Sequence, residues 1–442
     1  MRELLKKPVA FIMTHESDAS RTDSRGAMSI IALTLTRSLG RAGIDVVRIH
    51  PNLFDPSLDS KYCRAVEVCP NFYTSEHALT DFLTGLQAKY PGKHVLIPAS
   101  DDCCLYMARN EEALREQFLL LNPTAKTLQK LKNKRLQYEL AEASGVPVPE
   151  TYFPDSEAQV LALAEDLQNY PYVIKPTEAH KWRLADNRAI ANGKKAVTVH
   201  CKDDLLSEYR RISAFDKDLM IQEIIEGDDT QLYTFISYRS VNTPKLAFCI
   251  RSKLRQKPAK FGYCTASVTC HNDIVEAQSK RLLEASGFSG ISGVEFKFDA
   301  KTGLYKLIEI NTRPMNTLGI AMACGVNLPL IGYNDVVGIH QEPLADWRDG
   351  TVWVWWEQDY LAAKELRSRG SLTYRDWLKS LSGERVHAIL ASDDLRPAWR
   401  HYSRVVPRML LTMIKSSLGS CRRSARMRVD RFSETLGSSS AS

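Results

Sequence analysis

The part of the sequence best suited to chemistry is a pair of alternating segments that carries two carboxylates and an amide. Glu309 and Asn311 lie two residues apart in one segment, Glu295 sits between apolar neighbours in the other, and the turn Asp299–Gly303 joins them. Because residues two apart on a strand share a face, a hairpin here would gather three oxygen donors on one side. Such donors suit Mg²⁺, which commonly takes one or two carboxylates and adds substrate phosphates. The alternative is an exposed hairpin face whose charges stand in water.

Cations in nearby segments match an anionic ligand. Arg313 follows the hairpin and could bind a carboxylate or phosphate with two hydrogen bonds. Lys175 ends a short apolar strand, where it could meet a phosphate or simply extend its amine into water. Arg251, Lys253 and Arg255 alternate, so a strand would place all three on one face, which is costly unless that face meets water or an anion.

The stretch 220–229 predicts a strand that runs into a polar turn. Backbone groups at Glu223 and Ile225 could face an adenine edge, and Asp229 could accept hydrogen bonds from ribose hydroxyls. Neither G-x-x-x-x-G-K-[ST] nor G-x-G-x-x-G occurs, so the sequence contains neither a P-loop nor a Rossmann fingerprint. The glycines three apart that precede the hairpin segment are interpreted as turn glycines: Gly287, Gly290 and Gly293.

The elements that would position these residues begin with an α/β pattern over residues 1–125. Apolar runs alternate there with helix-like stretches, which predicts a doubly wound parallel sheet with helices on both faces. Ligands bind beyond the carboxyl ends of such strands, where Ser17–Arg25 and Ser100–Asp102 fall. The predicted strands are Val9–Met13, Asp45–Ile49 and Val95–Pro98, and the predicted helices are Met28–Ala42 and Glu76–Lys89.

A second region starts near Thr127 and mixes helices with strands, which predicts an α+β domain. Its predicted helices are Leu131–Ser144, Asp203–Ala214 and Gln278–Gly287. Its predicted strands are Tyr172–Lys175, Ala196–His200, Met220–Ile225, the pair Thr234–Arg239 and Leu246–Ser252, and the hairpin. Past about Asn334 a Trp-rich strand, Val352–Trp356, precedes charged helical sequence.

Composition excludes several classes of protein. The chain is 44% hydrophobic and 25% charged, as in globular proteins, and no stretch approaches the roughly 20 apolar residues of a membrane span. Ten cysteines include no C-x-x-C pair, so a zinc site has no support and reduced cytoplasmic thiols are expected. Between Arg400 and Arg431 there are nine Lys or Arg residues and one acid, so the net charge of +7 belongs to the tail.

At this point the sequence resembles the ATP-grasp superfamily, and within it carboxylate–amine ligases such as D-aspartate ligase and the carbamoyl-phosphate synthetase large chain. The resemblance rests on an ordered set of short pieces over about residues 130–330. They are Asn133-Lys134, Gly145-Val-Pro-Val-Pro149, Tyr172-Val-Ile-Lys-Pro176, Gln222-Glu-Ile-Ile-Glu-Gly227, Lys253-Leu-Arg255, Gly293-Val-Glu-Phe296 and Glu309-Ile-Asn-Thr-Arg-Pro314.

The resemblance implies a domain plan and a set of roles. A pre-ATP-grasp domain would span 1–125, an ATP-grasp domain 126–334 with a small lobe at about 172–226, an extension 335–400, and a basic tail 401–442. ATP phosphates would be held by Lys134, Lys175 and Lys253, adenine by Glu223 and Ile225, ribose by Asp229, one or two Mg²⁺ (or Mn²⁺) by Glu295, Glu309 and Asn311, and the γ-phosphate or acyl-phosphate by Arg255 and Arg313.

The implied reaction joins a small-molecule carboxylate to an amine through an acyl-phosphate, with ADP and phosphate as products. One departure from the family is the long polar stretch Glu178–Lys195, which stands where many members have a compact glycine-rich loop. It leaves open which cation closes over phosphate. The alternative is a non-catalytic ATP-binding regulator with the same fold; the complete set of hairpin ligands argues against it.

The basic tail adds two partner hypotheses. Its lack of interleaved aromatic residues argues against specific nucleic-acid binding. From about Pro407 the pattern is typical of an amphipathic helix, with a cationic sector of Arg408, Lys415, Arg422 and Arg426. Such a helix can lie on an anionic membrane surface, which would suit amino-acid ligation to a cell-envelope or polysaccharide precursor. The alternative is a helix docked on the protein's own body.

Overall fold

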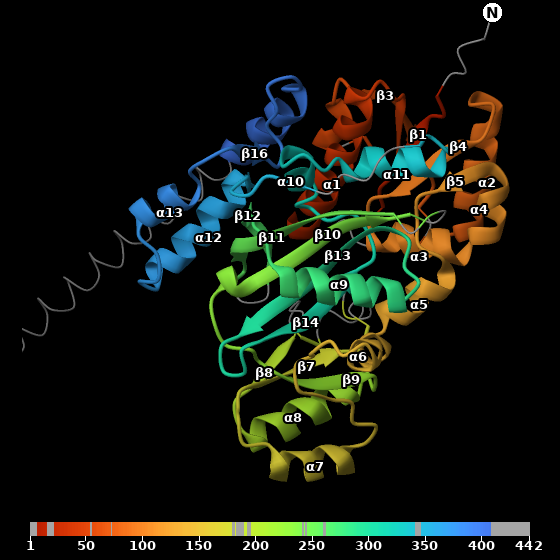
Figure 1. Cartoon of the computed structure of the whole chain (residues 1–442). Helices are drawn as coiled ribbons and strands as arrows, with labels where there is room; N and C mark the ends of the chain where they lie inside the picture. The colour runs from red at the N-terminus through yellow and green to blue at the C-terminus, as the bar shows by residue number, and fades with distance from the viewer. Residues whose placement is uncertain are drawn as a thin grey trace, which may run out of the picture. The chain divides into compact units, whose positions relative to one another are not determined.

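The computed structural model describes residues 7–15, 22–53, 55–71, 73–178, 182, 190–191, 196–240, 243, 245–259, 262–340 and 346–407, with the backbone alone for 22–28. The chain divides into two compact units, residues 1–389 and 390–442. Among the described residues, the first unit contains three sheets (Figure 1).

The first sheet is parallel and confirms the doubly wound α/β prediction. Its strand order is β3-β2-β1-β4-β5, and the inner strands β1, β2 and β4 are almost entirely buried, as in a parallel sheet with helices on both faces. Its strands are β1 (Ala10–Met13), β2 (Val46–His50), β3 (Cys63–Val68), β4 (His94–Pro98) and β5 (Phe118–Leu120). Its helices are α1 (Thr22–Arg41), α2 (Glu76–Lys89), α3 (Asp101–Arg109) and α4 (Glu111–Gln117). The core centres on Phe11, Val47 and Leu96.

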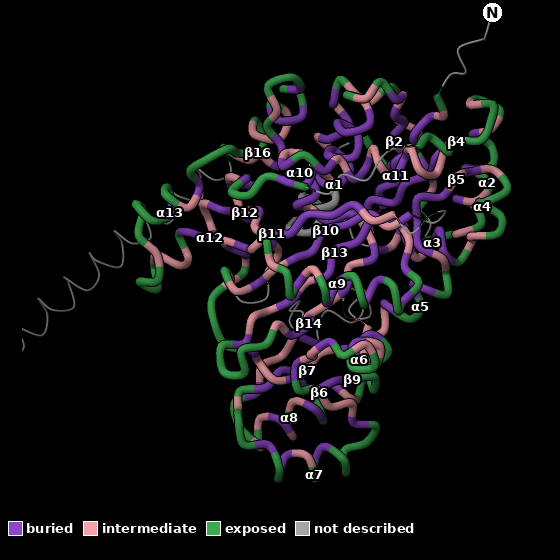
Figure 2. The backbone as a smooth tube through the Cα atoms, viewed as in Figure 1, coloured by how far each residue is buried: buried purple, intermediate pink, exposed green. Residues whose placement is uncertain are grey.

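The second sheet is small and antiparallel. Its four strands run in the order β6-β9-β7-β8: β6 (Thr151–Tyr152), β9 (Leu219–Glu223), β7 (Tyr172–Pro176) and β8 (Val197–Val199). Apolar side chains of α7 (Glu157–Asp166) and α8 (Lys202–Ser213), including Val160, Leu205 and Ile212, pack against Tyr172 and Ile221 of the sheet. Figure 2 shows that the outer sides of both helices are exposed. Two predicted ligand-binding positions lie in this sheet: Lys175 next to the last residue of β7, and Glu223 at the end of β9.

The third sheet carries the predicted hairpin. Its order is β14-β13-β10-β11-β12-β15-β16, antiparallel except for the last pair. Its strands are β10 (Leu232–Arg239), β11 (Leu246–Lys257), β12 (Tyr263–Thr269), β13 (Gly290–Asp299), β14 (Leu304–Asn311), β15 (Val352–Val354) and β16 (Arg385–His387). The predicted pairing of the β10 and β11 segments and the hairpin itself are confirmed.

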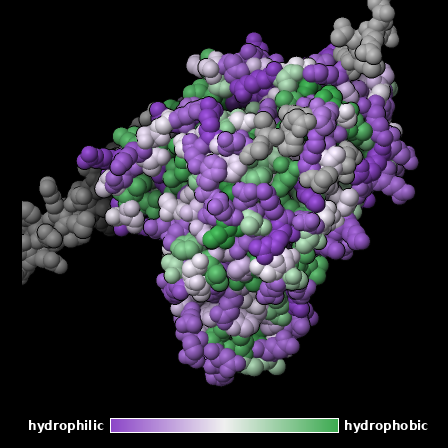
Figure 3. All heavy atoms as spheres, viewed as in Figure 1, coloured by the Kyte–Doolittle hydropathy of each residue, from purple (hydrophilic) through white to green (hydrophobic). Residues whose placement is uncertain are grey.

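Five helices accompany the third sheet, and α9 shows how their apolar sides are buried while their polar sides face solvent. They are α9 (Asp273–Ala285), α10 (Gly319–Ala323), α11 (Leu328–Val336), α12 (Trp356–Ser368) and α13 (Tyr374–Ser380). Helix α9 buries Val275, Leu282 and Leu283, and the surface above it in Figure 3 is hydrophilic. The predicted Trp-rich strand is shorter than expected, because Trp356 already begins α12.

Two sequence predictions need correction. A single helix over Leu131–Ser144 is wrong: α5 (Ala125–Lys132) stops, and α6 (Lys134–Ala143) starts afresh, because the extended Asn133 caps it through its side chain. Gly293 is not a turn glycine, since it lies within β13, where a Cβ would meet Met315 Sδ at 1.9 Å. The predicted domain boundaries stay predictions.

The basic tail falls largely outside the described residues. In the second unit, residues 396–407 are helical, so the helix that contains Pro407 begins before the predicted start near Pro407. The predicted cationic sector from Arg408 to Arg426 lies beyond the part of the chain that the structure describes. No described helix is both long and apolar enough to cross a membrane.

The cap at Asn133 gives a local test of how α6 is positioned. Its side chain accepts hydrogen bonds from Arg135 N (2.9 Å) and Leu136 N (3.3 Å). We expect Asn133→Ala to cost about 1 kcal/mol and to speed amide exchange at Arg135 and Leu136. Asn133→Asp, which retains the acceptor, should exchange as slowly as the wild type. Equal exchange in all three proteins would contradict the cap.

Candidate active site

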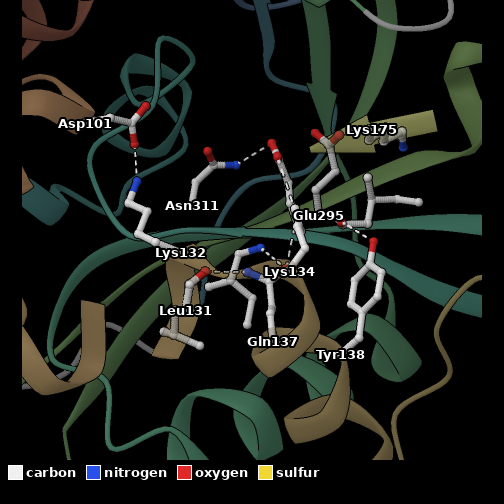
Figure 4. A network of polar contacts seen from close by, with 12 residues as sticks. Asp101, Leu131, Lys132, Lys134, Gln137, Tyr138, Lys175, Glu295 and Asn311 are labelled. Carbon is white, nitrogen blue, oxygen red and sulfur yellow. Dashed lines mark hydrogen bonds and ion pairs between the residues drawn. The ribbon is translucent and has the colours of Figure 1, made fainter. Parts of the chain in front are cut away.

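The hairpin sets two carboxylates directly opposite each other. Glu295 on β13 pairs with Glu309 on β14, and Gly293 pairs with Asn311 in the neighbouring register. Asn311 Nδ2 donates to Glu309 Oε1 at 2.9 Å, which fixes the amide beside the carboxylates (Figure 4). Glu309 is 44% exposed at its side chain and Glu295 only 12%. The three predicted metal ligands are therefore brought together on one face, with Glu309 toward solvent.

Each carboxylate faces a lysine. Lys253 Nζ lies 3.4 Å from Glu295 Oε2, and Lys134 Nζ lies 3.9 Å from Glu309 Oε2. Burial lowers the pKa of Lys134, while the two glutamates act in the opposite direction. In the free protein, two predicted phosphate-binding lysines thus balance the charge of two predicted metal ligands.

Helix α6 holds Lys134 in place through the backbone of β14. Lys134 Nζ donates to Ile308 O at 3.0 Å and to Gln137 Oε1 at 3.1 Å, and Tyr138 Oη also donates to Ile308 O at 3.0 Å. Gln137 Oε1 in turn accepts from Ile310 N at 3.2 Å. Figure 4 shows these side chains rising from α6 toward the strand. Sequence reasoning missed Gln137 and Tyr138; their spacing of three and four residues from Lys134 on a helix was the available signal.

Lys175 reaches the same network from the small sheet. Its Nζ donates to Gln222 Oε1 at 2.8 Å, and Gln222 Nε2 donates to Tyr138 Oη at 3.0 Å. Strands β7 and β9, α6 and β14 are therefore joined by one continuous set of hydrogen bonds. Gln222 is a further residue that the sequence reasoning did not assign.

Arg313 is held by Asp101 of helix α3, beside the first sheet. Its Nε lies 2.9 Å from Asp101 Oδ2, and Asp101 also pairs with Lys132 at the end of α5. Asp101 is the first residue of α3, just past the carboxyl end of β4, at the edge where ligands were predicted to bind. The structure thus places Arg313 between the hairpin and the first sheet.

The predicted nucleotide segment is partly engaged within the protein. Glu223 N donates to Glu150 O at 3.0 Å, and its carboxylate pairs with Lys306 Nζ at 2.5 Å. Ile225 O accepts from Lys297 Nζ at 2.8 Å. These backbone groups therefore lie close to a lysine-rich strip of β13 and β14.

Asp229, the predicted ribose acceptor, is also engaged. Gln256 donates to it twice, from its side chain at 2.7 Å and from its backbone at 3.2 Å. Burial raises the pKa of Asp229.

Arg255 is not brought to the hairpin. It forms a bidentate pair with Asp359, Nε to Oδ1 at 2.8 Å and Nη2 to Oδ2 at 2.9 Å, and donates to Ser380 Oγ at 2.7 Å. Asp359 is fully buried and also accepts from Trp377 Nε1 at 2.8 Å. This pair joins β11 to α12 and α13.

Two further observations concern where a metal or ligand could bind. Within the described ranges, no group of three or more His, Cys, Asp or Glu residues could hold a metal. Two carboxylates and an amide fall below that count, yet they fit Mg²⁺, which keeps waters and phosphates as its other ligands. A cavity of about 890 Å³ lined by Leu120, Arg239 and Phe288 contains none of the predicted site residues. Charge arrangement, and not cavity size, therefore marks the candidate site.

The described residues of the long stretch after β7 contact α8 and the loop that follows it, and Arg211 Nη1 of α8 donates to Ile190 O at 2.6 Å. Trp182 Nε1 donates to Asp216 Oδ2 at 2.9 Å, which ties the stretch to the end of α8. The cations predicted to close over phosphate, from Lys181 to Lys195, lie among residues that the structure does not describe.

The arrangement of the sheets is shared with solved structures of other proteins. The structure superposes on biotin carboxylase from Campylobacter jejuni with a TM-score of 0.58 at 14% identity, covering 78% of this chain and 75% of that one. It superposes on N5-carboxyaminoimidazole synthetase from Staphylococcus aureus with a TM-score of 0.55 at 15% identity, covering 76% and 79%. The chain therefore has the ATP-grasp fold, and the predicted ATP-grasp resemblance is confirmed.

Sequence comparison adds similarity to one ATP-grasp family and to two ligases. Residues 217–358 match the family described as ATP-grasp in the biosynthetic pathway with Ter operon. The chain is 24% identical over 272 residues to D-aspartate ligase from Enterococcus faecium, covering 60% of this chain and 64% of that protein. It is 24% identical over 212 residues to D-alanine–D-alanine ligase from Anaplasma marginale, covering 44% and 58%. The matches thus span about three fifths of these relatives' lengths.

The facing carboxylates give a binding prediction. We expect Glu309→Gln to weaken Mg²⁺ binding in the presence of ADP by at least about tenfold, because one of two anionic ligands becomes neutral. Calorimetric titration of Mg²⁺ into the ADP-bound protein measures this. Glu276→Gln on α9, which removes a surface pair with Lys280, is the matched control and should bind as the wild type does. Equal affinities for all three proteins would remove Glu309 from the metal site.

Proposed function

We propose that the protein is an ATP- and Mg²⁺-dependent ligase that joins a carboxylate to an amine and releases ADP and phosphate. The observation that carries the proposal is the facing pair Glu295 and Glu309 with the Asn311 amide, balanced by Lys134 and Lys253. Carboxylates matched to lysines in this way can exchange their internal partners for a metal ion and a phosphate chain. The ATP-grasp fold and the similarity to two amino-acid ligases support the same reaction class.

The proposed reaction has two steps. A carboxylate oxygen of the donor attacks the γ-phosphorus of ATP, the bond to the β–γ bridging oxygen breaks, and ADP leaves. The amine nitrogen then attacks the acyl carbon, the bond to the phosphate oxygen breaks, phosphate leaves, and the nitrogen loses a proton. Neither step needs a side-chain nucleophile, so catalysis consists of positioning and charge stabilisation.

The chain's own residues would divide this work. Lys134, Lys175 and Lys253 would bind the phosphates as point charges. Glu295, Glu309 and Asn311 would hold Mg²⁺, which supplies positive charge to the phosphate oxygens. Arg313, set by Asp101, would face the γ-phosphate or acyl-phosphate.

The substrates belong to broad chemical classes. Similarity to a D-aspartate ligase and a D-alanine–D-alanine ligase supports an amino acid as donor or acceptor. Ligation to a cell-envelope or polysaccharide precursor, in the cytoplasm or at the inner face of a membrane, would be compatible with a basic tail.

The product distribution tests the proposed chemistry. Incubating the wild type with Mg·ATP, the twenty common amino acids, D-aspartate and D-alanine should release ADP and phosphate in equal amounts. Glu309→Gln should abolish the release without loss of folded structure by circular dichroism. AMP and pyrophosphate as stoichiometric products would refute the acyl-phosphate route, and no hydrolysis at all would favour a nucleotide-binding regulator.

Lys175 provides a test of nucleotide binding that does not depend on turnover. We expect Lys175→Ala to raise the dissociation constant of a non-hydrolysable Mg·ATP analogue by roughly tenfold or more, because a charged hydrogen bond is lost. Lys202→Ala, in the same lobe but paired with Glu165 at the surface, is the control and should leave the constant unchanged. An unaltered constant in Lys175→Ala would exclude Lys175 from the phosphate site.

A further inference from the structure

Arg251 is a buried cation whose partners are all neutral. It lies on β11 with 1% of its surface exposed. Its Nε donates to Thr317 Oγ1 at 3.0 Å and its Nη1 to Cys264 Sγ at 3.6 Å. A guanidinium has five N–H donors, and sulfur is a weak acceptor. Within the described part of the chain, no carboxylate pairs with Arg251.

Three other buried or partly buried arginines of the first unit have carboxylate partners, whereas Arg239 donates to backbone oxygens. Arg48 lies 3.8 Å from Asp55, Arg255 is bidentate to Asp359, and Arg313 contacts Asp101. An unpaired charge in a protein interior is destabilising, so a chain normally supplies a counter-ion. Arg251, which has no carboxylate partner among the described residues, is therefore suited to hold an anion that binds beside it.

The sheet register places Arg251 in line with the metal ligands. Thr234 on β10 pairs with Arg251 on one side and with Glu295 on the other, and Glu295 pairs with Glu309. Directly opposite residues share a face, so all four lie on the same side of the sheet. With strands about 4.8 Å apart, the backbone of Arg251 is about 10 Å from that of Glu295.

The segment after the hairpin covers this row. Met315 Sδ fills the space above Gly293, Asn316 Nδ2 donates to Cys264 O at 3.1 Å, and Thr317 reaches Arg251. The same segment begins with Asn311 and Arg313. A ligand bound at the hairpin would therefore adjoin the residues that contact Arg251.

We propose that Arg251 binds the anionic head of the acyl donor: its carboxylate before phosphorylation and its acyl-phosphate afterwards. This inference rests on the proposed ligase function. Thr317 occupies Nε, whereas Nη1 has only a thiol acceptor and Nη2 has none among the described residues, so the Nη1–Nη2 edge can meet two carboxylate oxygens.

The distribution of charges explains why the donor needs this arginine. Glu295 and Glu309 would repel an incoming carboxylate, and Lys134 and Lys253 face those glutamates. Arg251 supplies a cation on the side of Thr234 away from the glutamates. Arg255, predicted from sequence for the acyl-phosphate, is instead occupied by Asp359.

A stability measurement tests the inference without a known substrate. Inorganic phosphate is the probe, titrated into the ADP- and Mg²⁺-bound protein while its thermal unfolding is followed, with choline chloride matching ionic strength. The wild type should gain stability with phosphate. Arg251→Met should unfold at the wild-type temperature or above, because an unpaired buried charge is removed, and should require at least tenfold more phosphate for the same gain.

Two variants serve as matched comparisons. Arg239→Met removes another strand arginine, one that donates only to the backbone oxygens of Leu283 and Phe288, and should keep the wild-type phosphate response. Arg255→Met should unfold at a lower temperature, because it leaves Asp359 buried without its partner. Arg251→Lys keeps the charge but loses the paired N–H donors of the planar guanidinium. Its phosphate response should therefore fall between those of the wild type and Arg251→Met.

Kinetics then separate this inference from the ligase proposal. With any amino acid that supports ADP release, Arg251→Met should raise the KM for that carboxylate at least tenfold and leave the KM for ATP unchanged. An unchanged KM for the carboxylate would overturn the role of Arg251 while the ligase proposal stands. A phosphate response that depends on Arg251, in a protein that hydrolyses no ATP, would support the anion site and refute the ligase. A wild type insensitive to phosphate, or a destabilised Arg251→Met with the full response, would overturn the inference.

Discussion

The opposition of Glu295 and Glu309 across one hairpin is the constraint around which the rest of the site is organised. Two like charges directly across a strand pair destabilise a sheet, so the fold must compensate them. It does so from two directions: Lys253 comes from within the same sheet, and Lys134 from a helix outside it. Because Lys134 must reach Glu309, the repulsion between the two glutamates constrains the position of α6.

The position of α6 follows from that requirement. The helix is bonded to the β14 backbone by Lys134, Gln137 and Tyr138, and it is linked to the small sheet through Gln222. Each buried polar group in this network has a partner, which makes such networks rigid and specific. The consequence is that the small sheet and the hairpin are linked by hydrogen bonds through the same helix that supplies Lys134 to Glu309.

Much of this arrangement could be predicted from sequence, because it depends on local periodicity. Alternation fixed the hairpin and its face, and the helix–strand pattern gave the parallel sheet. The missed parts depend on long separations: Asp359 pairs with Arg255 across 104 positions, and Asp101 of helix α3 meets Arg313 after the hairpin. Periodicity carries no information about such partners. The break before α6 is different, since Asn133 is a strong helix-capping residue and its signal was available in the sequence.

The ion pairs of Lys134 with Glu309 and of Lys253 with Glu295 affect the free energy of binding a metal ion at this site. A free divalent ion must displace ammonium groups that already satisfy the carboxylates, so it gains little by arriving alone. When a polyphosphate comes with the ion, the displaced lysines acquire new anionic partners, and the two binding events reinforce each other. In the proposed ligase, such heterotropic coupling would make the metal–nucleotide complex, rather than either component alone, the species that the site binds best.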